Sequence, residues 1–149
     1  MTNVFLVAKE FCRNMGWNLK HLDLQNVLYI AQVFSLGERG KKLFPDKIYA
    51  WSHGPIVPKI YYYLLPLDER IKLCESDFPN SILPINREDK LFIKDISSDL
   101  KGSSEVKLMT LATMDGGAWE SNCVPGRRDS IISENDMLSE YEMLWKDDN

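Results

Sequence analysis

The chain has 149 residues, of which 44% are hydrophobic and 27% charged, a balance typical of a soluble globular protein with one domain. Its formal net charge of −4 argues against a nucleic-acid-binding protein that works by neutralising phosphates, although a local basic patch is compatible with that charge. The three cysteines lack C-x-x-C spacing, the N-terminus lacks a basic signal-peptide start, and no apolar run approaches the ~20 residues of a membrane span, so we expect a cytoplasmic protein.

Two amphipathic helices are expected at the start of the chain. Apolar residues at helical spacing predict a first helix over 3–15, closed by Gly16. The same pattern predicts a second helix over 23–36, with Asp23 as its N-cap and Gly37 after its end. The apolar face of each helix is expected to point into the core.

A small β element is expected next. Two short apolar and aromatic runs, 42–44 and 47–51, are separated by Pro45-Asp46, which is a turn signal. We therefore predict a short β-hairpin from these two runs. Gly54-Pro55 is expected to end the second strand, because proline has no N–H to donate to a sheet.

After residue 57 the sequence pattern predicts further helices joined by longer loops. The stretch 67–85 follows Pro66, contains Pro79 and Pro84 and shows no sustained period, so we expect a surface connection with one helical turn at 68–73. The remaining expected elements, in chain order, are a helix over 58–65, one over 87–100, one over 105–113 capped by Ser103 or Ser104, a loop carrying Trp119 and Arg127-Arg128, and a last helix opened by Ser133. The predicted fold is mainly α, a compact single domain over 1–149 with about five to six helices and one short β-hairpin.

The histidines and cysteines do not form a recognisable catalytic or metal-binding pattern. His21 and His53 are the only histidines, and a metal site needs three or four converging ligands. A nucleophilic pair such as Cys74 with His53 has no flanking signature and would depend on the fold alone. We therefore expect one exposed loop histidine and one histidine hydrogen-bonded at the tight corner that Gly54-Pro55 forms after the strand, with no catalytic residues, no metal and no cofactor.

Aromatic residues are more informative about binding. Trp51 and Trp119 each flank a glycine-containing turn, and burial as packing anchors and exposure in an aromatic-lined groove explain them equally well. Tyr61, Tyr62 and Tyr63 follow one another on a predicted helix, which cannot bury three successive side chains on one face. At least one of these rings is therefore expected near the surface, where tyrosine is common in protein-binding sites.

Two segments of the first half carry a family resemblance. The segments are L-Q-N-V-L-Y-I-A-Q (24–32) and A-W-S-H-G-P-I-V-P-K-I-Y (50–61). They resemble the K-L-Q-K-L-L-Y-Y-A-Q and A-W-x-x-G-P-V-V-P-x-V-Y signature of the Panacea domain, a family that includes the SocA-like antitoxins and the phage-associated GepA proteins. The resemblance extends from about residue 4 to about residue 144.

The second half departs from the family pattern. The segment G-S-S-E-V-K-L-M-T-L-A-T-M-D-G-G-A-W (102–119) is similar to the family's G-L-S-A-x-E-L-S-x-L-T-H-x-x-G-x-P-W. However, Ala112, Thr113 and Ala118 stand where threonine, histidine and proline are usual. A binding function tolerates the loss of that histidine more easily than a catalytic function does.

The resemblance implies an antitoxin that is not an enzyme and that neutralises a cognate protein toxin, encoded by an adjacent gene, through direct contact. The residues expected to contact the toxin lie around the glycine–proline corner and in the later loop. They are Trp51, His53, Gly54, Pro55, Tyr61, Tyr62, Trp119, Arg127 and Arg128.

Two further hypotheses remain open. The first, also implied by the resemblance, is a proteolytic adapter that delivers a bound toxin to a ClpXP-type protease through its chaperone. The second is a prophage-encoded interaction protein, hydrolase or nucleic-acid-binding protein. The acidic charge, the two histidines and the lack of a nucleophile motif argue against the hydrolase and the nucleic-acid binder.

Overall fold

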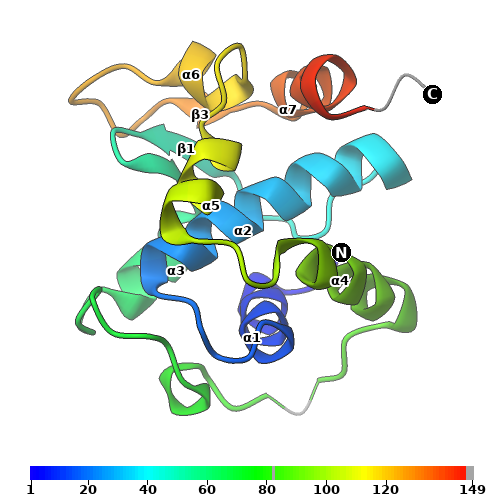
Figure 1. Ribbon diagram of the computed structural model, residues 1–149, viewed down its shortest axis with the longest axis vertical. Helices are drawn as coiled ribbons and strands as arrows, with labels where there is room; N and C mark the ends of the chain where they lie inside the picture. Colours follow the sequence, from blue (N-terminus) through cyan, green and yellow to red (C-terminus); the bar gives the residue numbers. More distant parts are fainter. Residues whose placement is uncertain (82, 147–149) are drawn as a thin grey trace.

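Helix α2 (His21–Phe34) lies at the centre of the molecule, with the other helices arranged around it (Figure 1). The computed structural model describes residues 1–81 and 83–146. Twelve of the 14 residues of α2 are buried, as expected for a helix that is covered on nearly all sides. The elements that pack against it include α1 (Val4–Asn14), α4 (Arg87–Leu100), α5 (Glu105–Ala112) and α7 (Glu134–Glu140).

The ends of α2 differ from the sequence-based prediction. The helix begins at His21, so Asp23 is not its N-cap but lies in its first turn, where its carboxylate accepts a hydrogen bond from the Lys20 backbone N–H at 3.0 Å. At the other end, α2 continues into one wider turn, the π-helix η1 (Ser35–Arg39). That turn ends at Gly40, whose positive φ of 70° suits a residue without a Cβ.

The β element was predicted in the right region but with the wrong partner strand. Strand β1 (Ile48–Trp51) pairs antiparallel with β2 (Gly54–Ile56) and with β3 (Ile131–Ile132), in the order β2-β1-β3. Gly54 and Pro55 therefore begin a strand instead of ending one. Proline is tolerated there because β2 is an edge strand, where one side of the backbone needs no partner.

The remaining elements follow in chain order. They are α3 (Pro58–Leu64), the 3-10 turn η2 (Glu75–Asp77), α6 (Ala118–Asn122) and the C-terminal π-helix η3 (Tyr141–Trp145). In the stretch 68–73, predicted to hold one helical turn, a single hydrogen-bonded turn joins the Ile71 N–H to the Asp68 carbonyl at 3.1 Å. The 3-10 turn η2 follows it, and there Asp77 accepts a hydrogen bond from the Cys74 backbone N–H at 2.8 Å. The loop predicted to carry Trp119 contains α6. Ser104, one of the two predicted caps of α5, accepts a hydrogen bond from the Lys107 backbone N–H at 3.1 Å.

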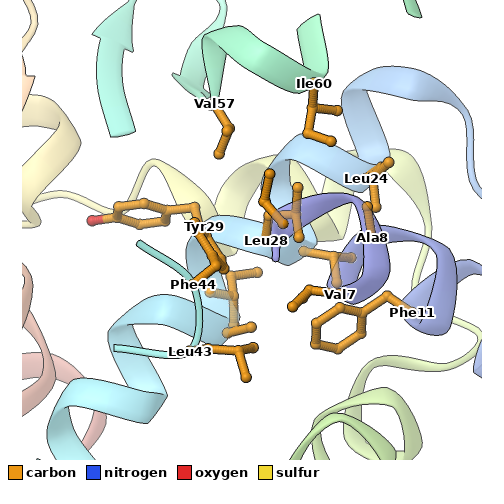
Figure 2. Close-up of a cluster of buried hydrophobic side chains, with 14 of the residues drawn as sticks. Val7, Ala8, Phe11, Leu24, Leu28, Tyr29, Leu43, Phe44, Val57 and Ile60 are labelled. Atoms are coloured by element: carbon orange, nitrogen blue, oxygen red, sulfur yellow. The ribbon is translucent and has the colours of Figure 1, made fainter. Parts of the chain in front are cut away.

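The core joins the first three helices to the segment that precedes the sheet. Figure 2 shows one cluster in which side chains of α1 and α2 lie between Ile60 of α3 and the pair Leu43 and Phe44, both of which are fully buried. Burying one such large apolar side chain stabilises the fold by about 1.5–3 kcal/mol. Leu43 and Phe44 thus serve as core residues, although their run was predicted to be a strand.

The fold is a mainly helical single domain with a small antiparallel sheet, which confirms the predicted fold class. Seven α-helices and three strands are present in residues 1–81 and 83–146, more than the predicted five to six helices and one hairpin. Within the same ranges, no helix combines the length and the apolar character needed to cross a membrane.

Candidate functional site

Two glutamines of α2 fix the backbone on either side of the sheet. The Gln25 side chain accepts a hydrogen bond from Val57 N–H at 2.8 Å and donates one to Val57 C=O at 3.4 Å. The Gln32 side chain accepts from Leu43 N–H and donates to Phe44 C=O, both at 2.8 Å. Both glutamine side chains are buried. Each amide satisfies the backbone N–H and C=O groups of the neighbouring segment, which would otherwise lack a hydrogen-bond partner. The corner between β2 and α3 is therefore held by Gln25.

The side chain of His21 lies next to that of Gln25 and is uncharged. Its Nε2 lies 3.1 Å from the Gln25 side-chain nitrogen. Since the Gln25 oxygen already accepts from Val57 N–H, the Gln25 NH₂ must donate to His21, whose Nε2 then carries no proton. Burial lowers the pKa of His21 to about 4, in agreement with this arrangement.

Each of the two histidines is found in the kind of environment, buried or exposed, that was expected for the other. His21, expected in an exposed loop, is buried in α2, and His53, expected to be hydrogen-bonded at the corner, is exposed in the turn between β1 and β2. The helix begins earlier than predicted, which brings His21 inside it.

Trp51 is the centre of an aromatic cluster at the corner. Its ring is 4.9 Å from that of Tyr61 and 6.2 Å from that of Tyr62, both edge-to-face. Tyr61 and Tyr62 are themselves edge-to-face at 5.3 Å. Trp51 is buried, Tyr61 is half-buried and Tyr62 is 56% exposed, so the cluster passes from core to solvent. Such geometry fixes each ring against its neighbours.

Two segments of the second half complete the cluster. The Arg128 guanidinium lies over the Trp51 ring, with Cζ 4.3 Å from the ring centroid, and the Arg128 carbonyl accepts a hydrogen bond from Trp51 Nε1 at 3.1 Å. Trp119 Nε1 donates to the Trp51 carbonyl at 2.8 Å. We call the surface formed by Trp51, Tyr61, Tyr62, Trp119 and Arg128 the corner face.

The four other residues predicted at this site lie near the corner face but have different surroundings. Gly54 is buried with φ of 132°, and a Cβ there would lie 3.5 Å from Asn26 Oδ1. Pro55 is buried opposite Ala50 in the sheet. His53 is exposed, and Arg127 forms an exposed ion pair with Asp129 at 2.9 Å. Gly54 and Pro55 therefore shape the corner from within.

The buried carboxylate of Glu140, which was not expected from the sequence, holds α6 and thereby positions Trp119. Glu140 Oε1 accepts hydrogen bonds from the Ala118 N–H at 2.8 Å and from the Tyr29 hydroxyl at 2.5 Å. A Cβ at Gly117 would lie 2.8 Å from the same oxygen, which explains why glycine precedes α6. The available signal was a glutamate at a position of α7 that faces the core, which needs partners when buried.

The charged and polar groups at the corner do not form a metal site. Among the described residues, no group of three or more histidine, cysteine, aspartate or glutamate side chains could hold a metal ion. Cys12 is buried in the core, and burial raises the pKa of its thiol to about 12, which disfavours a reactive thiolate. The corner face therefore presents aromatic rings together with the Arg128 guanidinium.

Comparison with protein families identifies one matching family. The family model described as "Antitoxin SocA-like, Panacea domain" matches residues 24–120, which include α2 from Leu24 onward, the β1–β2 hairpin and Trp119. The chain therefore belongs to the SocA-like antitoxin, Panacea domain family. Searches of curated proteins and of solved structures each found no match.

The departure from the family pattern in the second half has a definite place in the fold. Thr113, at the position where the pattern has histidine, lies beside the corner glycine, with its Cγ2 3.9 Å from where a Cβ of Gly54 would be. Its hydroxyl donates to the Met109 carbonyl at 2.7 Å. The substituted position thus faces the corner from α5.

Proposed function

We propose that this chain is an antitoxin that neutralises a cognate protein toxin by covering the toxin's working surface with the corner face. Membership of the SocA-like antitoxin family implies a toxin partner. The observation that supports the corner face as the binding surface is the convergence of Trp51, Tyr61, Tyr62 and Arg128 at one place. Tryptophan, tyrosine and arginine dominate the energetics of protein interfaces.

The rigidity of the corner face favours binding without a large entropic cost. Trp51 is held by hydrogen bonds at both its indole nitrogen and its carbonyl, and its ring is held by two tyrosines. Side chains that are already ordered lose little freedom on association. Tyr62 and the Arg128 guanidinium are the parts that a partner can reach, since both residues are exposed.

Neutralisation by this mechanism requires no chemical step. An interface of standard size buries about 1,600 Å² in total, which is enough to occlude an active site. The cation of Arg128, stacked over Trp51, suits a carboxylate or carbonyl on the toxin.

We infer that the functional unit is larger than the matched family region. Helix α1, which precedes residue 24, and helix α7, which follows residue 120, both pack against α2. Arg128 and Glu140 also lie outside the matched residues, yet one contacts Trp51 and the other holds α6. On this basis residues 1–149 act as one Panacea-like domain.

The test is co-expression of the tagged chain with the product of the adjacent gene, together with a growth assay of that gene alone. We expect the neighbour to be toxic alone and to be rescued and co-purified by this chain. A neighbour that is harmless and does not co-purify would contradict the proposal for that gene pair.

The corner face itself is tested with two exposed positions. Tyr62→Ala and Arg128→Ala should each weaken toxin binding by about tenfold or more, the size of a hot-spot effect, with the unfolding midpoint nearly unchanged. Matched controls are Tyr63→Ala, whose ring packs against Phe5 instead of Trp51, and Arg70→Ala, which pairs with Asp68 on the surface. If the two corner variants bind as tightly as the controls, the corner face is not the toxin-binding surface.

A further inference from the structure

A groove lies along the C-terminal half of α2 and shares no residue with the corner face. It is an open apolar groove of about 330 Å³ between α2, α4, α5 and the C-terminal η3. Its apolar walls are Ile30, Phe34, Ile96, Leu100, Leu111 and Trp145. Phe34, Leu111 and Trp145 are only half-buried, so their apolar surface faces solvent through the groove.

The groove keeps its shape because its C-terminal wall is fixed. The Trp145 ring is edge-to-face with Phe34 at 4.9 Å, and Trp145 Nε1 donates to Glu140 Oε2 at 3.0 Å. The Tyr141 ring packs so closely on Gly37 that a Cβ there would overlap it. The groove is therefore a preformed cavity that side chains of its own walls do not fill.

The charges beside the groove are mostly negative. Asp99 lines it, and the charges of Asp99 and Asp95 add to burial in raising the pKa of Glu38 above its usual range, against the smaller opposing effect of Arg39. None of these three carboxylates forms an ion pair with another described residue, and Lys107 is the one cation among the lining residues. Carboxylates that repel one another beside an apolar cavity would be stabilised by cations from a partner.

We propose that this groove binds a basic amphipathic segment of a partner protein, with one large apolar side chain in the cavity and lysine or arginine beside Glu38, Asp95 and Asp99. Helical segments bind grooves in this way, through apolar residues three or four positions apart. A second copy of this chain is the less suitable occupant, because the chain carries a net charge of −4.

The test uses a displayed library of random peptides of about 12 residues, long enough for three helical turns, selected on the whole protein. We expect the enriched peptides to carry a large apolar residue flanked by lysine or arginine. Enrichment of acidic or uncharged peptides, or of none, would overturn the proposal. No toxin is present in this experiment, so its result is independent of the corner face.

The location is tested with an isolated enriched peptide and matched variants. Leu111→Asn, which makes one wall polar, should weaken peptide binding by about tenfold, whereas Met109→Asn, on the exposed side of the same helix, should not. The double variant Asp95→Asn with Asp99→Asn, both at exposed positions, should weaken binding by about threefold or more at low salt and less at high salt.

If the peptide binds the wild type, Leu111→Asn and the Asp95→Asn, Asp99→Asn double variant with equal affinity, it binds elsewhere and the proposal is overturned. Sedimentation of the free protein addresses the other occupant. A dimer that Leu111→Asn dissociates would assign the groove to a second copy of the chain instead.

Discussion

The corner face and the groove lie along the same central helix but are built in opposite ways. At the corner, every aromatic ring is held by another ring or by a hydrogen bond. The charged group there is the Arg128 guanidinium, which lies over the Trp51 ring. At the groove, apolar side chains surround an unfilled cavity, and the nearby carboxylates repel one another. One region presents a closely packed surface, and the other presents a groove.

This difference shows how one small helical domain can offer two kinds of recognition. A filled aromatic surface binds by covering a partner, and its specificity depends on the shape of exposed edges. An apolar cavity with charges of one sign binds by accepting a side chain of the partner, so it selects both size and charge. The two regions should therefore respond differently to the same kind of substitution.

The largest contrast is expected from the same truncation in both regions. Trp51→Ala removes a buried ring that is 5% exposed and should lower the free energy of unfolding by about 3–5 kcal/mol. Trp145→Ala removes a half-exposed ring and should cost about 1–2 kcal/mol, because less apolar surface returns to water. Urea unfolding of both variants measures the two values. Similar losses would mean that the groove wall is as integral to the core as the corner.

A smaller effect is expected from Gly37→Ala, which affects only the groove end. The added methyl overlaps the Tyr141 ring, so η3 must move, at a cost of about 1–3 kcal/mol. The Trp145 fluorescence should change because its wall moves with Tyr141. The control is Gly40→Asn, at a position with positive φ that asparagine tolerates and with open space around it. Unchanged unfolding and fluorescence in Gly37→Ala would show that the groove wall is not fixed by this contact.

An effect of similar size is expected from pH and originates at the corner, in His21. Unfolded His21 binds a proton below about pH 6.5, whereas folded His21 does so only below about pH 4, so between these values the unfolded state holds more protons. Stability should therefore fall by about 2 kcal/mol as the pH drops through this window, partly offset by Asp23, whose pKa burial raises.

The check is to measure urea midpoints of the wild type and of His21→Gln at about pH 7 and about pH 4.5. The variant keeps a hydrogen-bond acceptor for Gln25 but loses the titrating ring, so its midpoint should depend less on pH. His53→Gln, at an exposed position, serves as the control. A pH dependence that is identical in all three proteins would exclude His21 as its source.

The corner was largely predictable from the sequence, and the groove was not. Trp51, Tyr61, Tyr62, Trp119 and Arg128 were singled out as sequence features, and the fold brings them together. Three of them lie within one continuous segment formed by β1, β2 and α3, so local chain geometry already places them near one another. The groove depends on four elements that together span positions 21–145, and no local pattern reveals a space between them.

The sequence by itself determined the mainly helical fold, the positions of most helices and the family of the protein, because helical periodicity and short motifs are local properties. Only the tertiary structure decided which strand pairs with β1, why Gln25 and Gln32 occupy α2, and where Glu140 finds its partners. Each of these depends on a backbone or buried polar group that must find a partner far away in the chain. Such partners are chosen by packing in three dimensions, where every buried donor and acceptor has to be satisfied.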